Sequence, residues 1–199
     1  MNSLPIFLPM ALFAFASSIT PGPNNIMLAS SGLNYGFRRS VPHMLGISGG
    51  FMIMLVVTGL GLGTLFQTWP VLHDILKILS AVYLLYLAWR IATAGPVTTA
   101  EHSGRPFSFI QAALFQWVNP KAWTMALGVI AVYVPQQDFL TNLLLSALLC
   151  GLVNLPSISV WTLFGMALRR WLRQPGVVRA FNVLMALLLV ASLYPMLRN

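Results

Sequence analysis

Acidic residues are nearly absent from this chain of 199 residues, which holds three Asp and Glu against eleven Lys and Arg and has a formal net charge of +8. Charged residues make up 7% of the sequence, whereas a soluble domain carries roughly 25%. With 58% of the residues hydrophobic, this composition indicates an integral membrane protein whose partner is the lipid bilayer. The basic residues form no stripe interleaved with aromatics, so we expect no nucleic-acid partner.

Cysteine is scarce too, since Cys150 is the only one. A single cysteine excludes an intrachain disulfide and a cysteine-based metal site, and its apolar surroundings favour a small buried residue. The sequence also lacks a His-Glu-x-x-His zinc motif, so we expect no metal and no cofactor. Residues 1–3 carry no positive charge of the kind that opens a signal peptide, and we interpret them as the start of a retained first helix.

Apolar segments long enough to cross a bilayer are abundant, given that a crossing helix needs about 20 residues. Six segments qualify, at residues 4–33, 41–66, 75–94, 107–134, 139–168 and 177–197. A polar linker at 95–106 separates repeat one, about 1–94, from repeat two, about 107–199. The sequence therefore predicts an all-α integral membrane protein with a single transmembrane domain over 1–199.

Basic residues are concentrated in alternate loops. The loop after the first segment holds Arg38 and Arg39, and the loop after the third is bounded by Arg90 and Arg105. The loop after the fifth holds Arg169, Arg170, Arg173 and Arg179. The opposite ends of the segments hold only Lys77 and Arg198, together with Asp74 and Asp138. Because cytoplasmic loops are enriched in Lys and Arg, we expect these three loops in the cytoplasm and both termini on the other side.

Two of the six segments are interrupted by helix-breaking residues. Pro21 and Pro23 remove backbone donors from the first segment, and Gly22 adds conformational freedom. Pro120 interrupts the fourth segment 99 positions after Pro21, half the chain away. Three segments per half is an odd number, so the second repeat is inverted relative to the first. Such matched breaks point to a transport site, with simple proline kinks as the alternative.

The residues around the breaks suit a zwitterion. The half-helix that begins at Asn24 and Asn25 points amides into the gap and suits a carboxylate. Lys121 is a cation at membrane depth, opposed by the dipole of its own half-helix, and therefore favours a visiting anion. Freed carbonyls near Thr20 and Asn119 suit an ammonium group. The structural alternatives are helix capping by the Asn residues and snorkelling of the Lys side chain to an interface.

The fifth segment contains Asn154 two positions before Pro156, and we expect a third proline break there. Glycines of the second segment, Gly46 and Gly50 among them, are expected to allow close helix packing, with a thin-walled cavity as the alternative. The complete candidate site comprises Thr20, Pro21, Gly22, Pro23, Asn24, Asn25, Asn119, Pro120, Lys121 and Asn154.

No Asp or Glu lies within any expected span, although ion-coupled carriers often use an intramembrane carboxylate. Any coupling must therefore use Lys121, a histidine such as His43, or the substrate itself. His43 lies close to Arg38 and Arg39 in the sequence, and we expect it at the membrane interface.

These motifs resemble the bacterial lysine-exporter (LysE/RhtB) family of amino-acid exporters over nearly the whole chain. The resemblance rests on Thr20-Pro21-Gly22-Pro23-Asn24-Asn25, Gly36-Phe37-Arg38, Gly46 and Gly50, Val118-Asn119-Pro120-Lys121, and residues 184–190. The Pro-Gly-Pro-Asn-Asn form is most similar to the branch that exports cysteine and O-acetylserine. Exporters of basic amino acids typically have Gly-Pro-Gln-Asn instead.

The resemblance implies a six-helix secondary active exporter of small neutral amino acids or their derivatives in the bacterial inner membrane. With the orientation expected from the basic loops, both termini are then periplasmic. The resemblance also implies coupling to the proton motive force and a possible homodimer. An intramembrane enzyme is one alternative, but no paired carboxylates lie within the expected spans. A non-transporting membrane subunit is another, against which the short loops weigh. A channel would need a ring of like charges or a filter-like repeat, and neither occurs.

Overall fold

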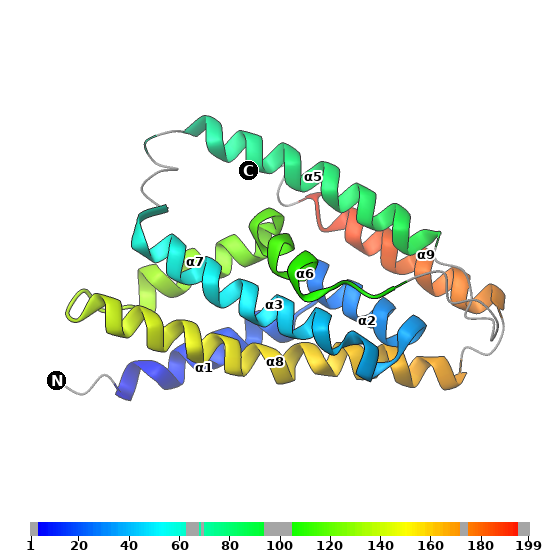
Figure 1. Cartoon of the computed structure of the whole chain (residues 1–199), viewed down its shortest axis with the longest axis horizontal. Helices are drawn as coiled ribbons and strands as arrows, with labels where there is room; N and C mark the ends of the chain where they lie inside the picture. Colours follow the sequence, from blue (N-terminus) through cyan, green and yellow to red (C-terminus); the bar gives the residue numbers. More distant parts are fainter. Residues whose placement is uncertain (1–3, 63–67, 69, 94–104, 172–174, 195–199) are drawn as a thin grey trace.

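The computed structural model describes residues 4–62, 68, 70–93, 105–171 and 175–194. This part of the chain contains eight α-helices and no strand, which confirms the all-α prediction. Figure 1 shows most of the helices running along the long axis of the molecule, with α5 and α9 together on one side of the others.

The first apolar segment is broken where the prolines predict. Helix α1 (Leu4–Ile19) and helix α2 (Pro23–Tyr35) are inclined to each other by 57°. Gly22 between them has extended backbone angles and precedes Pro23 at the first position of α2, where a missing N–H costs nothing. Two prolines separated by a single glycine thus end one helix and begin the next.

The fourth segment is broken as well. Helix α6 (Phe109–Phe115) passes into a short 3₁₀ turn, η2 (Gln116–Val118), before helix α7 (Pro120–Tyr133) begins. Asn119 is extended, as the residue before a proline tends to be. Both predicted breaks in the first and fourth segments are therefore confirmed.

The third expected break, at Pro156, is wrong. Helix α8 (Phe139–Trp171) continues through this proline. A lone proline removes one backbone hydrogen bond. Nearby serine hydroxyls donate to carbonyls of the preceding turn, Ser157 Oγ to Val153 O at 2.8 Å and Ser159 Oγ to Leu155 O at 2.7 Å.

The second segment forms helix α3 (Phe37–Val57) and a π-helical turn, η1 (Thr58–Leu62). The helix starts before the predicted residue 41, and the predicted end at 66 lies outside the described residues. The third and sixth segments form α5 (Pro70–Ala92) and α9 (Pro175–Ala191), which pack against each other (Figure 1). The linker at 95–104 lies outside the described residues.

Glycines allow two helix pairs to approach at backbone distance. A Cβ on Gly32 would collide with the Thr162 carbonyl, and one on Gly165 with the Ala29 carbonyl, so α2 and α8 touch directly. Gly46 and Gly50 lie against the backbone of α6 in the same way. The packing role predicted for the glycines of the second segment is thereby confirmed at these two positions.

Two described helices are long and apolar enough to cross a bilayer, Phe37–Gly61 and Phe139–Leu168. The bent pair Ile6–Ile19 and Pro23–Tyr35 makes a third if it is one span. Three shorter apolar helices, Ile78–Ala92, Phe109–Val118 and Gly176–Ala191, accompany them. Together these helices support a multi-pass membrane protein.

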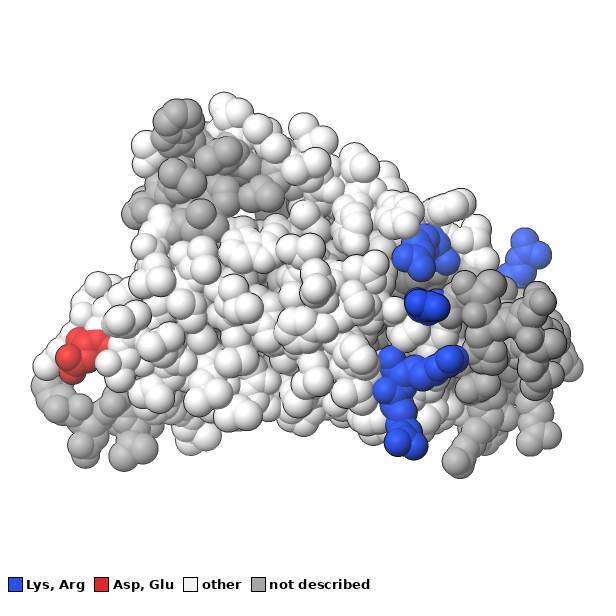
Figure 2. Space-filling view, in the orientation of Figure 1, with Lys and Arg blue, Asp and Glu red and all other residues white. Residues whose placement is uncertain are grey.

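Apart from Lys121, the described basic and acidic side chains lie at opposite ends of the molecule. Figure 2 shows the visible Lys and Arg side chains gathered at one end and the acidic side chain at the other. We call the first the arginine end. There α2 ends, α3 begins, α5 ends and α9 begins (Figure 1), and these elements and the segment before α6 carry Arg38, Arg39, Arg90, Arg105 and Arg179.

Candidate functional site

The two helix breaks face each other across a small polar cavity, which we call the central cavity. Its volume is about 40 Å³, room for a few water molecules. Eight of its lining residues are polar or charged: Ser17, Ser18, Asn24, Asn25, Gln116, Asn119, Lys121 and Asn154. Gly22 and the apolar residues Ile47, Phe51, Ala122, Met125 and Ile158 complete the lining.

Lys121 joins the second break to the first. Its Nζ donates to Thr20 O at 2.7 Å, to Thr20 Oγ1 at 2.9 Å and to Pro21 O at 3.3 Å. We call this set of bonds the lysine tie. It crosses from the amino end of α7 to the carboxyl end of α1, where the helix dipole favours a cation.

The lysine tie revises the electrostatic prediction for Lys121. We expected a cation opposed by the dipole of its own half-helix. The long side chain instead carries its charge to the carboxyl end of another half-helix. Gly22 makes room for it, because a Cβ on that residue would lie 2.8 Å from Lys121 Cδ.

Two further side chains satisfy carbonyls at the carboxyl end of α1. Asn25 Nδ2 donates to Ser18 O and to Thr20 O, each at 2.7 Å. Trp161 Nε1, from α8, donates to Ile19 O at 2.9 Å. The carbonyls that we expected to be free for a substrate ammonium are thus already occupied in this conformation.

The amino ends of the two half-helices differ. At α7, Asn119 Oδ1 accepts a hydrogen bond from Lys121 N at 3.1 Å and caps the helix. At α2, Gly22 has no side chain to provide such a cap. The first amides of α2, those of Asn24 and Asn25, are therefore the open ones, and both residues line the same cavity as Lys121.

A pair of amide side chains links the breaks a second time. Asn24 Nδ2 donates to Gln116 Oε1 at 2.8 Å, and Gln116 Nε2 donates to Asn24 Oδ1 at 3.3 Å. Gln116 is buried and also donates to Ala112 O at 2.8 Å. Asn24 and Gln116 thereby hold the start of α2 against the end of α6.

The structure brings six of the ten predicted site residues to the central cavity: Gly22, Asn24, Asn25, Asn119, Lys121 and Asn154. The other four, Thr20, Pro21, Pro23 and Pro120, shape the breaks without lining it.

Sequence reasoning missed Ser17, Ser18 and Gln116. A signal existed, because Gln116 stands four positions before Pro120 as Ser17 stands four positions before Pro21. The same offset of 99 aligns Gly22 with Lys121.

Asn154 reaches the cavity from the unbroken α8, and its Nδ2 donates to Ser48 Oγ at 3.2 Å. Ser48 lies in Gly-Ile-Ser-Gly-Gly, which matches the Gly-x-Ser-x-Gly pattern of serine hydrolases. That pattern requires a strand-to-helix turn with a histidine nearby. Here the five residues lie inside α3. Neither ring nitrogen of His43 has a hydrogen bond to Ser48 or to any other described residue.

His43 was expected at the membrane interface, and the structure shows that its side chain is buried inside the protein. The residue is only 2% exposed. Its ring lies 5.2 Å from that of Phe107. Within the described residues, no cluster of His, Cys, Asp and Glu could hold a metal ion.

Comparison with known proteins gives one consistent result. A family model described as "LysE type translocator" matches residues 15–192. The chain is 33% identical to the cysteine/O-acetylserine efflux protein of Salmonella typhimurium over 189 residues, 92% of this chain and 95% of that protein. The protein of the same name from Escherichia coli (strain K12) is 33% identical over 180 residues, covering 89% and 90%. No solved structure shows significant similarity.

Proposed function

Because the chain belongs to the LysE-type translocator family, we propose that it is a secondary active exporter of small neutral amino acids or their derivatives across the bacterial inner membrane. The observation that carries this proposal is the central cavity, where two broken helices bring amides, carbonyls and one lysine together. Such a site midway along the spans is where secondary transporters bind substrate.

We further propose six spans arranged as two inverted repeats, 1–94 and 107–199. The two broken segments run in opposite directions in Figure 1, which supports this arrangement. The pairing of α5 with α9, the third and sixth segments, supports it as well. The arginine end faces the cytoplasm, and both termini are periplasmic.

The substrate carboxylate binds between Lys121 Nζ and the open amides of Asn24 and Asn25. In this position the carboxylate neutralises the positive charge of the lysine and accepts hydrogen bonds at the uncapped amino end of α2. The ammonium group donates to Asn25 Oδ1, which accepts no hydrogen bond within the described residues, and to Ser18 Oγ, a buried hydroxyl without a partner there. A small neutral side chain then faces Phe51 and the other apolar lining residues.

Substrate binding competes directly with the lysine tie. A carboxylate that draws Lys121 away from Thr20 and Pro21 removes a contact between the two repeats, and a cavity of about 40 Å³ must widen to admit an amino acid. Binding thus loosens the two repeats, which then rock to open the other side.

The substrate class follows from the charge of the site. None of the described lining residues is acidic, so a basic side chain would find no partner there. Cysteine and O-acetylserine, named for the similar efflux proteins, meet the requirement for a small neutral side chain.

Counterflow in proteoliposomes tests the proposal. Wild-type protein is expected to exchange radiolabelled cysteine or O-acetylserine but not lysine. Lys121→Ala and Asn25→Ala are each expected to lower the rate at least about tenfold, since each removes a hydrogen bond to a charged group.

Arg38→Ala and Asn142→Ala are the matched controls, because both residues are polar and lie outside the cavity. Full activity in both cavity variants would refute the site, and absence of any amino-acid counterflow by the wild type would refute the function.

A further inference from the structure

A second cavity of about 70 Å³ lies toward the arginine end of the molecule. It is formed by α2, α3, α5 and the segment before α6, and shares no lining residue with the central cavity. Its polar lining consists of Ser30, Ser31, Asn34, Tyr35, His43, Arg90 and Arg105.

Two buried side chains of this lining have polar atoms without partners. His43 is 2% exposed, and neither ring nitrogen has a hydrogen bond within the described residues. Asn34 is 4% exposed, and its Oδ1 is likewise without a partner there, although its Nδ2 donates to Ser30 O at 2.8 Å. Buried polar atoms nearly always find partners, so these atoms indicate a ligand with complementary groups.

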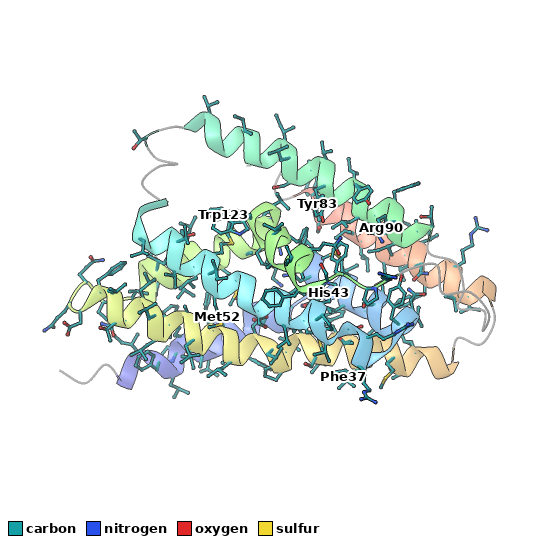
Figure 3. All side chains as sticks on the ribbon, in the orientation of Figure 1. Phe37, His43, Met52, Tyr83, Arg90 and Trp123 are labelled. Carbon is teal, nitrogen blue, oxygen red and sulfur yellow. The ribbon has the colours of Figure 1, made fainter. Side chains whose placement is uncertain are left out.

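Cations lie at the mouth of the same cavity. Arg105 is exposed in the segment before α6, and Arg90 is in the last turn of α5. The Arg90 guanidinium lies 5.9 Å from the centre of the Phe107 ring and 6.0 Å from that of Tyr86, which orients it by cation–π attraction. Figure 3 shows Arg90 and His43 in the half of the molecule that contains Phe37, at the start of α3.

We propose that the second cavity is a loading site that binds the amino acid before it reaches the central cavity. This inference rests on the proposed export function. Arg90 and Arg105 receive the carboxylate, since guanidinium groups present several donors to a carboxylate. Asn34 Oδ1 and the acceptor nitrogen of a neutral His43 ring receive the ammonium.

Helices α2 and α3 contribute lining residues to both cavities. On α3, His43 lines the second cavity, while Ile47 and Phe51, one and two turns further along the same face, line the central one. On α2, Asn25 lines the central cavity and Asn34 the second, roughly 14 Å apart along the helix axis. The loading site therefore lies on the arginine side of the central site, the side assigned to the cytoplasm.

Transport into inside-out membrane vesicles tests the loading site, because the arginine end then faces the added O-acetylserine. Arg105→Gln is expected to raise KM about tenfold, as for the loss of one charge-assisted hydrogen bond, with Vmax within about twofold of wild type. Arg38→Gln is the matched control, since it removes an exposed arginine from the same end but not from the cavity.

His43→Leu separates a ligand-binding role from a structural one. Replacing a buried polar side chain without partners by an apolar one should leave thermal stability unchanged or raise it. A loading site predicts that KM nevertheless rises about tenfold, as expected for one lost hydrogen bond to a charged group. Lower stability with an unchanged KM would overturn the proposal.

Three other outcomes separate failure of the loading site from failure of the proposed export function. If the wild type transports and both variants keep its KM, the loading site is refuted while export stands. If the KM changes require anionic lipid in reconstituted vesicles, the cavity holds a lipid phosphate and the loading site is refuted. If the wild type transports no amino acid, the proposed function itself has failed.

Discussion

At the scale of single residues, one glycine and one lysine determine how the breaks meet. Gly22 has extended backbone angles that any residue can adopt, so its importance is spatial. The space that a Cβ would fill is taken by the aliphatic part of Lys121. These two residues are separated by the same 99 positions as Pro21 and Pro120, so the first break provides the room and the second provides the charge.

Gly22→Ala is therefore expected to fold and yet to export poorly. Its Cβ would lie 2.8 Å from Lys121 Cδ and 3.2 Å from Nζ, so the flexible lysine must move away from the Thr20 carbonyl. Displacing a positioned group by about 1 Å can cost up to about 100-fold in rate, and we expect at least about tenfold in counterflow.

The control is Gly128→Ala in α7, whose Cβ would make ordinary contact with the Phe13 ring at 3.4 Å. Wild-type counterflow by Gly22→Ala would show that the lysine tie plays no part in transport.

At the scale of elements, α2 depends on α8 for its position. Gly32 and Gly165 let the two helices meet backbone to backbone. Trp161 of α8 also holds the carboxyl end of α1 at Ile19. The long unbroken α8 thus supports both halves of the broken first segment.

Gly165→Ala should destabilise this support, because its Cβ would collide with the Ala29 carbonyl. Overpacking of this kind costs about 1–3 kcal/mol, and we expect a lower melting temperature for the detergent-purified protein. Gly176→Ala in α9 is the matched control, with nothing within 4 Å of its Cβ. Equal melting temperatures for the two variants would contradict the close contact.

The elements that the sequence predicted correctly are those set by local chemistry. Proline at positions 21, 23 and 120 has no N–H wherever it stands, so both breaks could be foreseen. Pro156 has the same chemistry, but α8 packs along its length and tolerates one missing bond. The cavity positions of Gln116 and His43 were harder to predict, because a polar residue in an apolar segment does not reveal which face of its helix lines a cavity.

Partners across the fold could not be foreseen at all. That Lys121 would bind carbonyls of α1 depends on how two segments about 100 residues apart pack together. The same is true of the second cavity, which α2, α3 and α5 form only after they have assembled.

At the scale of the whole molecule, charge and cavities define a direction. The described arginines outside the central cavity gather at one end, and Asp138 lies at the other (Figure 2). The second cavity lies between the arginine end and the central cavity. If the arginine end is cytoplasmic, a substrate meets cations first, then the buried polar groups of the second cavity, and then the lysine tie.

Cysteine labelling tests this orientation. In a Cys150→Ser background, Gln137→Cys places a thiol between α7 and α8, and Arg38→Cys places one at the start of α3. Because Lys and Arg favour the cytoplasmic side, a membrane-impermeant maleimide should label Cys at 137 in intact cells and Cys at 38 only in inside-out vesicles. The Cys150→Ser parent provides the unlabelled baseline, and the native Cys150, which is 0% exposed, should also resist labelling. The reverse pattern would show the opposite orientation in the membrane, with the second cavity on the exit side. Labelling of both positions from outside would contradict the assignment of the two ends to opposite sides of the membrane.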